Sequence, residues 1–388
     1  MTNQTRKRDL IILGGGCAGL SLAARLAQQS PRIAFTVVEP RIRYEEDRTW
    51  CGWRIAPHFF SDCVVAHWDK WRIASAQRSL LLHSKNYPYE MISAGLVYDK
   101  ACASIRSSAS AEILLGLSAE AVVETTEDVR VTLSDGSVIC SPWVIDTRPQ
   151  LRILKEPWLW QNFVGYVVQC DLPLAIDNDA PVLMDFLPPG EGIAQFMYTI
   201  PFGENQFLFE LTRFSKAHGE EQVLEASLVR WLRNHVGNGW QLERREAGSL
   251  PMAPSIAVGQ HRIRHAGTRG GSMRISTGYA FHRIQRWADE CAHSILRDGK
   301  PSAPASNSLL DAMDELFLRV LQQPSTSPEV IFTDLFGSCP TDRIIRFLSG
   351  VPRASDYWPV ASGLPWGKFL RETPSLARAW FSGAESQI

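Results

Sequence analysis

The sequence predicts an α/β fold that begins with a dinucleotide-binding βαβ unit, and three observations near the N-terminus support this prediction. An apolar run over residues 9–13 is typical of a buried strand, and residues 17–28 have the spacing of an amphipathic helix. The segment Gly14-Gly15-Gly16-Cys17-Ala18-Gly19 joins them and contains the pattern G-x-G-x-x-G. A second apolar strand, residues 35–38, ends at Glu39, 20 residues beyond Gly19.

Each glycine of this loop has its own role in a dinucleotide site. Gly14 allows the tight turn, Gly16 lets the backbone approach a pyrophosphate, and Gly19 lets the helix pack closely on the strand. The helix N-terminus faces the phosphate charge, and Glu39 lies where such a unit places the acid that binds a ribose hydroxyl. A glycine-rich turn in an ordinary α/β protein is the alternative, and the position of Glu39 favours the dinucleotide site.

Composition and charge exclude several classes of protein. The 388 residues are 45% hydrophobic and 21% charged, so we expect one large domain or two closely packed domains with a substantial core. A net charge of −1 argues against a nucleic-acid-binding protein. The eight cysteines show no C-x-x-C spacing and the histidines no ligand spacing, so no metal site is predicted. No run approaches 18 apolar residues, so no membrane span is expected.

The order of the remaining elements is typical of FAD-binding flavoproteins. Strands at residues 120–124 and 129–133, a turn at 134–137 and a returning apolar strand that ends at Asp146 form a meander after the βαβ unit. Dehydrogenases that bind only NAD usually continue directly as alternating strands and helices. Four further strands predict an antiparallel, substrate-facing layer: 162–170, 182–187, 195–200 and 206–212.

The second half of the chain is predicted to be largely helical. Helices are expected at residues 220–236, 278–297, 308–323, 328–337 and 340–349, with a linker at 299–308. The resulting domains are a discontinuous FAD-binding domain (1–150 and 245–300), a substrate domain (151–244) and a helical C-terminal region (301–388).

A second glycine-rich loop, Gly267 to Tyr279, precedes the long predicted helix. Its backbone amides have few side chains around them, so they can reach a pyrophosphate or a flavin ring. A flexible surface loop is the alternative. Paired with the first loop and Asp146, it is predicted to be the second contact region of an extended FAD. The residues expected to take part are Gly270, Gly271, Thr277 and Gly278.

Several segments of the chain resemble one known family. In chain order they are the Gly14–Gly19 loop with Glu39, Asp47-Arg48-Thr49-Trp50-Cys51, the stretch from Pro201-Phe202 to Phe209-Glu210-Leu211-Thr212, Gly248-Ser249-Leu250-Pro251-Met252, and the Gly267–Tyr279 loop. With them the chain resembles the FAD-dependent lycopene cyclase family, most closely the bacterial lycopene beta-cyclases. The resemblance spans nearly the whole chain. It implies a p-hydroxybenzoate-hydroxylase-like flavoprotein fold, with a Rossmann-type FAD domain, an antiparallel substrate layer and a helical tail.

The resemblance also implies a reaction. The family cyclises the ends of linear carotenoids without net oxidation or reduction, so an isomerase-type intramolecular lyase that forms β-ionone rings is expected. It implies FAD that is active in its reduced form, NADPH as the reductant, and Arg48 in the cofactor site. This chain departs from the family pattern at one point, because many members carry two adjacent acids where this chain has Glu210-Leu211. The role of the second acid and the preferred substrate therefore stay open.

Glu210 is the predicted catalytic acid. Protonating an alkene requires a carboxylic acid that is neutral at neutral pH, and desolvation raises a carboxyl pKa in this way. The neighbours of Glu210 are apolar, and alternation in a strand places Leu208 and Thr212 on its face. A strand carboxylate paired with Arg213 or another base is the alternative.

The predicted substrate is a hydrophobic polyene. Aromatic faces stabilise a cation in a dry tunnel, so Trp50, Trp53, Phe196 and Tyr198 are candidates to face it. The expected substrate contacts are Trp50, Trp53 and Tyr198, with Thr212 on the face of Glu210. The expected location is cytoplasmic, with peripheral contact at the inner face of the membrane, where such a substrate dissolves. Three alternatives stay open: a flavin monooxygenase or reductase with another isoprenoid or aromatic substrate, a cyclase of a non-carotenoid polyene, and a non-enzymatic isoprenoid-binding flavoprotein.

Overall fold

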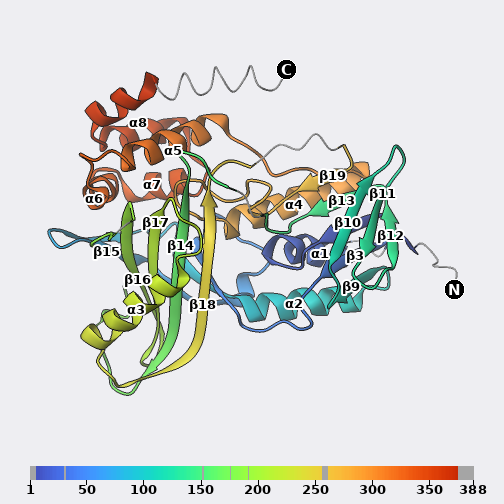
Figure 1. Ribbon diagram of the computed structural model, residues 1–388, viewed down its shortest axis with the longest axis horizontal. Coiled ribbons are helices and arrows are strands. Elements are labelled where there is room, and N and C mark those ends of the chain that lie inside the picture. Colours follow the sequence, from blue (N-terminus) through green and yellow to red (C-terminus); the bar gives the residue numbers. More distant parts are fainter. Residues whose placement is uncertain are drawn as a thin grey trace.

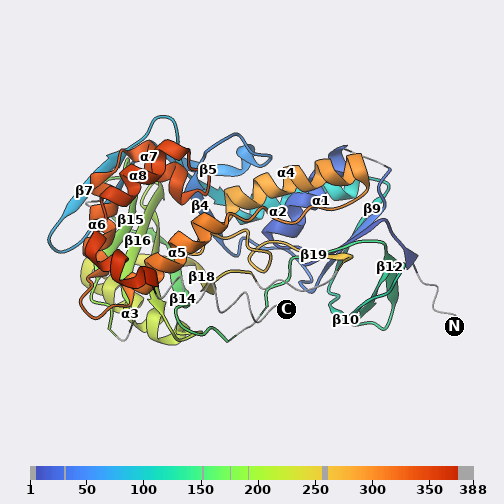
Figure 2. The same cartoon turned by 90° about the horizontal axis from the view of Figure 1, so that it is seen from above.

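The computed structural model describes residues 6–29, 32–150, 153–174, 176–190, 192–255 and 261–374. A parallel sheet with its helices lies at one end of the molecule, and a larger, mostly antiparallel sheet lies at the other (Figure 1). Helices of the C-terminal region cover part of the larger sheet (Figure 2). Residues 375–388 of the expected helical tail lie outside the described residues.

The parallel sheet confirms the predicted βαβ unit. Its strand order is β19-β13-β2-β3-β9, and its strands are β2 (Leu10–Leu13), β3 (Phe35–Glu39), β9 (Ala111–Leu115), β13 (Val144–Asp146) and β19 (Ile263–His265). Helix α1 (Cys17–Gln29) packs on α2 (Ala94–Ser107) and α4 (Phe281–Asp298) through its leucines and alanines. Since β2 lies between β3 and β13, the strand ends at Glu39 and Asp146 flank the glycine loop.

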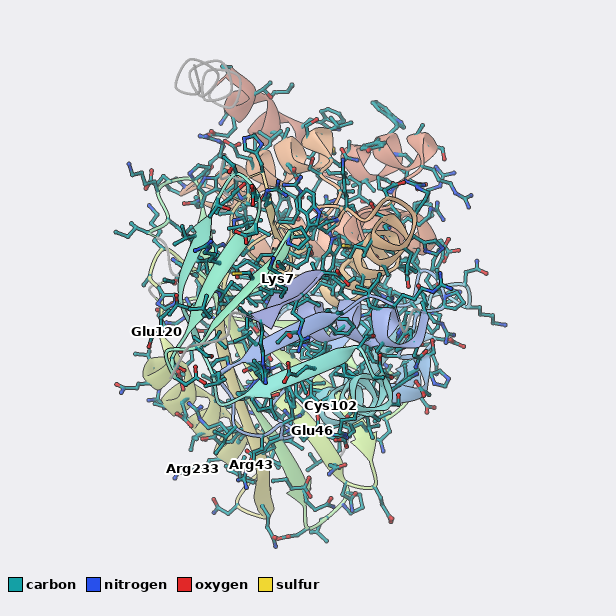
Figure 3. All side chains as sticks on the ribbon, turned by 90° about the vertical axis from the view of Figure 1, so that its right-hand side faces the viewer. Lys7, Arg43, Glu46, Cys102, Glu120 and Arg233 are labelled. Carbon is teal, nitrogen blue, oxygen red and sulfur yellow. The ribbon has the colours of Figure 1, made fainter. Side chains whose placement is uncertain are left out.

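A small sheet covers the outer end of the parallel sheet. Its order is β1-β12-β11-β10, and its strands are β1 (Arg6–Lys7), β10 (Ala119–Glu124), β11 (Val129–Leu133) and β12 (Val138–Ser141). Figure 3 faces this end, where Lys7 lies on β1 and Glu120 on β10, the two outer strands. Valines of β11 pack against Ile11 and Leu13 of β2, which joins the meander to the βαβ unit.

The large sheet has seven strands in the order β18-β14-β17-β16-β15-β6-β7. Its strands are β6 (Lys70–Ala74), β7 (Ser79–His83), β14 (Leu159–Cys170), β15 (Val182–Leu187), β16 (Ala194–Gly203), β17 (Gln206–Ser215) and β18 (Trp240–Met252). The four central strands were predicted. Strand β18 was not, because its run of charged residues from Glu243 to Glu246 hides the alternation typical of a strand. Its pairing with β14 places residues 245–252 in this sheet, although they were assigned to the FAD-binding domain.

Different layers cover the two faces of the large sheet. Helix α3 (Glu221–His235) packs on one face through Leu224, Leu228 and Leu232, which recur every four residues along one stripe. On the other face, Phe186 of β15 and Phe214 of β17 contact Phe332 of the C-terminal region. Phe196 of β16 packs against both of these rings. The helices of that region are α5 (Ser308–Leu321), α6 (Pro328–Ser338), α7 (Thr341–Leu348) and α8 (Ala354–Ser362).

A three-stranded sheet lies between the two larger ones. It contains β4 (Thr49–Trp53), β5 (Val64–Trp68) and β8 (Tyr89–Ser93), with a short 3-10 turn at η1 (Ser61–Cys63). Strand β4 carries the Arg-Thr-Trp segment and contacts α4. Within the described parts of the chain, none of the helices has the length and apolar character needed to cross a bilayer.

Candidate functional site

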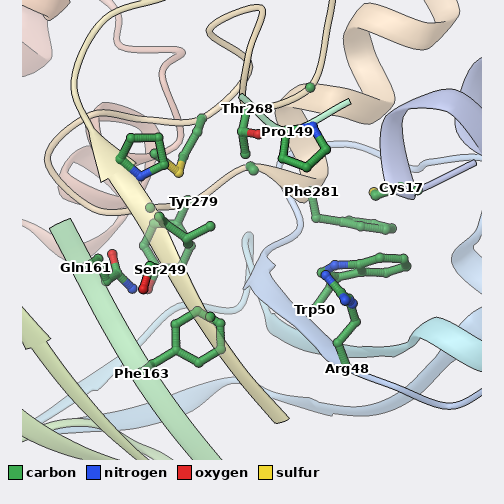
Figure 4. Close-up of a pocket in the computed structure, with 18 of the residues that line it drawn as sticks. Cys17, Arg48, Trp50, Pro149, Gln161, Phe163, Ser249, Thr268, Tyr279 and Phe281 are labelled. Carbon is green, nitrogen blue, oxygen red and sulfur yellow. The ribbon is translucent and has the colours of Figure 1, made fainter. Parts of the chain in front are cut away.

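A cavity of about 990 Å³ runs between the parallel sheet and the seven-stranded sheet. Its volume lies at the upper end of the range for small-molecule sites, so it has room for an extended ligand. Figure 4 shows part of its wall, in which Cys17 comes from the βαβ unit, Trp50 from β4, Phe163 from β14 and Thr268 from the second glycine-rich loop. The cavity therefore brings together four segments that the sequence analysis singled out separately.

The first glycine loop has the geometry that a dinucleotide requires. Gly14 has a φ of +93°, which L side chains rarely adopt, and a Cβ on Gly19 would lie 1.9 Å from the Gly14 carbonyl oxygen. A Cβ on Gly16 would meet no atom within 4 Å. Gly14 and Gly16 line the cavity, whereas Gly19 lies behind them and sets the spacing between helix and strand. The open space at Gly16 is therefore the cradle that an anionic group can enter at the α1 N-terminus.

Glu39 is held at the end of β3, beside this cradle. Its carboxylate accepts hydrogen bonds from the Gly15 N–H (2.6 Å) and from the Arg41 Nε (2.9 Å). Glu39 lines the cavity, and so does Arg48, whose guanidinium pairs with Asp47 at 3.1 Å. A rigidly held carboxylate in this position is suited to bind the hydroxyls of a ribose.

Asp146 does not line the cavity, although it was expected to contact the cofactor. It is only 3% exposed, and it forms ion pairs with Arg148 (2.9 Å) and Arg269 (2.7 Å), which themselves line the cavity. These two guanidiniums lower the pKa of Asp146 against the effect of its burial. Asp146 therefore orients the guanidinium groups of Arg148 and Arg269 toward the cavity. These two arginines were not predicted from the sequence.

The second glycine-rich loop meets the cavity through only part of its length. Thr277 and Gly278 line it, whereas Gly270 and Gly271 do not. A Cβ on Gly270 would lie 2.3 Å from the His265 carbonyl oxygen, so this glycine serves a tight turn after β19. The loop is fastened from behind by a buried ion pair between Arg274 and Asp314 of α5, at 2.8 Å.

The two tryptophans of β4 have different surroundings. Trp50 lines the cavity and stacks on Phe281, with ring centroids 5.6 Å apart (Figure 4). Trp53 is 1% exposed and does not line the cavity, because the rings of Trp71, Tyr89 and Tyr279 surround it. The expectation of a substrate contact at Trp53 therefore has no support in its position.

Glu210 lies on the cavity face of β17. Leu208 and Thr212 line the cavity with it, as the alternation predicts, and the Thr212 hydroxyl donates a hydrogen bond to Glu210 Oε1 at 2.9 Å. Arg213 points elsewhere and pairs with Glu220 at 3.0 Å. Burial, followed by the negative charge of Glu246, raises the pKa of Glu210 from 4.5 to about 8, and the hydrogen bond from Thr212 opposes the rise.

Leu211 faces the opposite side of the sheet. It is 1% exposed and packs with Phe209 and Leu228 between β17 and α3. An acid at this position would not reach the cavity, because neighbouring residues of a strand point to opposite faces.

A second carboxylate in the cavity comes from Glu246 of β18, which the sequence analysis missed. It lines the cavity and lies on the same sheet face as Glu210. Its Oε2 accepts hydrogen bonds from the Thr49 N–H (2.7 Å) and Arg244 Nη1 (3.0 Å). The local sequence does not predict a site residue here, because Glu246 follows a run of charged residues on an edge strand.

Three tyrosines complete this part of the wall. Tyr198 pairs with Glu210 across β16 and β17, and its hydroxyl lies 2.9 Å from that of Tyr89. Tyr279 also lines the cavity and contributes to the same cluster. Burial raises the pKa of each phenol well above its usual range, so all three stay neutral hydrogen-bonding groups.

The fold is the one found in flavoproteins of the p-hydroxybenzoate-hydroxylase-like class. A geranylgeranyl bacteriochlorophyll reductase-like protein from Thermoplasma acidophilum shares the fold with a TM-score of 0.66 at 14% identity, over 96% of this chain and 100% of its own. The flavin-dependent monooxygenase PieE, solved with FAD and substrate, matches with a TM-score of 0.61 at 13% identity, over 92% of this chain and 71% of its own.

The sequence family is narrower than the fold class. The family model described as lycopene cyclase protein matches residues 9–372, and this chain belongs to that family. The lycopene beta-cyclase of Pantoea ananas is 24% identical to this chain, in an alignment that covers 92% of this chain and 94% of that protein.

Proposed function

We propose that this protein is an FAD-dependent carotenoid cyclase that converts the ψ-ends of a linear carotenoid into β-ionone rings. The observation that carries the proposal is Glu210, a buried carboxyl with a raised pKa on a largely apolar and aromatic cavity wall. The same cavity continues to a dinucleotide cradle. Membership of the lycopene cyclase family supports the substrate class.

The wall residues fit FAD at one end of the cavity. The space at Gly16 suits the pyrophosphate, Glu39 suits the ribose, and the cations Arg148 and Arg269 supply positive charge nearby. Thr277 and Gly278 offer backbone close to the polyene end. When bound in its reduced form, FAD supplies negative charge near the reacting alkene. NADPH is the proposed source of the electrons.

The remaining chemistry belongs to side chains of this chain. Glu210 donates its proton to the terminal alkene, which leaves a tertiary carbocation that a neighbouring double bond attacks. Loss of a proton from the new ring restores neutrality, so atoms and electrons balance without an oxidant. The rings of Trp50, Phe163 and Tyr198 line the cavity, where they stabilise positive charge and exclude water.

The proposal is tested by expression in cells that accumulate lycopene, followed by pigment analysis. We expect cyclised carotenoid from the wild-type chain and unchanged lycopene from Glu210→Gln at equal protein and flavin content. Glu243→Gln is the matched control, because Glu243 is an exposed acid on strand β18 of the same sheet. Product that contains oxygen, or NADPH consumed in step with product, would instead support a monooxygenase or reductase. A folded, flavin-loaded wild type without turnover would refute the cyclase.

We also propose that the polyene enters from a membrane surface at the C-terminal helices. A second, strongly apolar cavity of about 200 Å³ shares Thr277, Phe332 and Leu335 with the main cavity. Trp366, which lines it, lies with its ring 5.9 Å from that of the exposed Trp358. Tryptophans with one apolar and one wet side favour membrane interfaces.

Vesicle co-sedimentation tests the membrane contact. The double variant Trp358→Ala/Trp366→Ala should lose binding to phospholipid vesicles, and it should retain its flavin. Trp143→Ala, at the opposite end of the molecule, is the control. Unchanged vesicle binding of the double variant would refute this surface.

A further inference from the structure

Glu210 and Glu246 face each other across a single glycine. Gly165 of β14 is the register partner of Glu210 on β17 and of Glu246 on β18. A Cβ on Gly165 would lie 3.3 Å from the Glu210 Cβ and 3.1 Å from the Glu246 Cγ. The two acidic side chains therefore come from strands that are not adjacent, and the residue between them has no side chain of its own, although Leu208 Cδ1 also lies 3.2 Å from that Cβ position.

The two carboxyl groups have different hydrogen-bond partners. Glu246 is 5% exposed, and its Oε2 is held by the Thr49 N–H and by Arg244, whose other nitrogen donates to the Thr49 hydroxyl at 2.6 Å. Its Oε1 has no hydrogen-bond partner among the described residues. Glu210 accepts a bond only from Thr212 in this part of the chain. Burial raises the pKa of Glu246, but a backbone N–H and a guanidinium oppose this rise by stabilising its ionised form, and Glu210 has neither, so the charge belongs on Glu246 and the proton on Glu210.

Other ionisable groups also face this pair. Those on the elements packed against it are Arg48 and Cys51 from the β4 segment, Tyr89 from β8, Tyr198 from β16, Arg244 from β18 and Tyr279 from the second glycine-rich loop. Burial raises the pKa of the thiol and of the three phenols above their usual ranges, and the guanidiniums stay charged. Of this set, Glu210 is therefore the group whose pKa, about 8, lies near neutral pH.

We propose that Glu246 is the fixed anionic partner of Glu210, and that the two carboxyl groups share one proton at the start and at the end of each catalytic cycle. The inference rests on the proposed cyclase function. The pair begins with the proton on Glu210, transfers it to the terminal alkene carbon, and then carries two negative charges beside the carbocation. The proton that the new ring loses returns to the pair, so the pair ends the cycle as it began.

This arrangement explains two features of the sequence. Leu211 stands where the family resemblance leads us to expect a second adjacent acid. Its side chain packs away from the cavity, so the absence of an acid at this position leaves the pair intact. The Arg-Thr-Trp segment also gains a role, because Thr49 holds Glu246 with its backbone N–H and Arg244 with its hydroxyl. Glu246 is thus a positioning residue whose charge acts through Glu210.

The test measures protonation and turnover separately. The pKa of Glu210 is followed by NMR of carboxyl-labelled glutamate in the flavin-loaded enzyme without substrate, with Glu210→Gln to assign the signal. We expect Glu246→Gln to lower this pKa by about one unit or more, because a like charge has been removed. The alkaline limb of the activity profile should move to lower pH by the same amount, with about tenfold less activity above it. Glu243→Gln should change neither.

Two outcomes would overturn the inference: an unchanged pKa of Glu210 in Glu246→Gln, or an activity profile that keeps its alkaline limb. If Glu246→Gln fails to fold because Arg244 loses its partner, the double variant Arg244→Gln/Glu246→Gln removes both charges and is measured in the same way. The NMR titration needs no carotenoid. A shift of the Glu210 pKa without any turnover would therefore refute the cyclase reaction and leave the carboxyl pair standing.

Discussion

Two glycines of the first loop allow cofactor binding and folding to be separated. A Cβ at Gly16 would have no atom within 4 Å. Gly16→Ala should therefore leave the free energy of unfolding of the flavin-free protein unchanged within about 0.5 kcal/mol. The same methyl group would stand between the backbone and a bound pyrophosphate. Overpacking of this kind costs about 1–3 kcal/mol, so the affinity for FAD should fall about 5- to 150-fold.

Substitution of Gly19, the last glycine of the loop, should instead destabilise the folded protein. A Cβ at Gly19 would lie 1.9 Å from the Gly14 carbonyl oxygen and 3.2 Å from Thr147 Oγ1. The carbonyl oxygen belongs to the backbone and cannot rotate away, so α1 must separate from the turn after β2. We expect Gly19→Ala to lower the free energy of unfolding of the flavin-free protein by about 3 kcal/mol.

The assay combines thermal unfolding of the flavin-free protein with titration of FAD by fluorescence quenching. Gly367→Ala is the control, because a Cβ there also has no atom within 4 Å and the residue lies in the C-terminal region. Wild-type affinity for FAD in Gly16→Ala would refute the placement of the pyrophosphate. A wild-type midpoint in Gly19→Ala would refute the close packing of helix and strand.

Three further predictions concern buried groups. Leu211→Glu should lower the free energy of unfolding by several kcal/mol, measured by chemical denaturation, whereas Leu211→Met should be tolerated. Pigment analysis should show that Leu211→Glu does not restore activity to Glu210→Gln. Because folding raises the pKa of Glu210, this carboxyl group contributes fully to the free energy of unfolding below pH 4.5, and the contribution is lost as the pH rises through about 8. The free energy of unfolding of Glu210→Gln, measured by denaturation at each pH, should not show this decrease. Asp314→Asn should lower the free energy of unfolding by about 3–5 kcal/mol, because Arg274 stays buried without its partner; a change below 1 kcal/mol would contradict this.

Local sequence patterns predicted the elements that depend on nearest neighbours. The glycine loop, the helix after it and the strand that ends at Glu39 were predicted close to their observed bounds, because φ preferences and hydrophobic spacing act within a few residues. The predicted first and last residues of the strand at 182–187 agree with those observed. The alternation of β17 also predicted which of its side chains share a face with Glu210.

Strand β18 marks the limit of such patterns. Its charged residues lack the hydrophobic alternation by which strands are detected, and only pairing with β14 makes this segment part of the sheet. Likewise, Trp50 and Trp53 are the same residue type on one strand, and only the aromatic rings packed around Trp53 remove it from the cavity.

The chain alone thus determines the dinucleotide loop, the family resemblance and the acid at Glu210, since each lies within one short segment. Tertiary structure decides that Asp146 acts through two arginines and that Leu211 faces a helix. It also brings Glu246 beside Glu210, across a residue 45 positions from the one and 81 from the other. The physical reason is that burial and charge proximity, which set a carboxyl pKa, are properties of the folded surroundings and not of the neighbouring sequence.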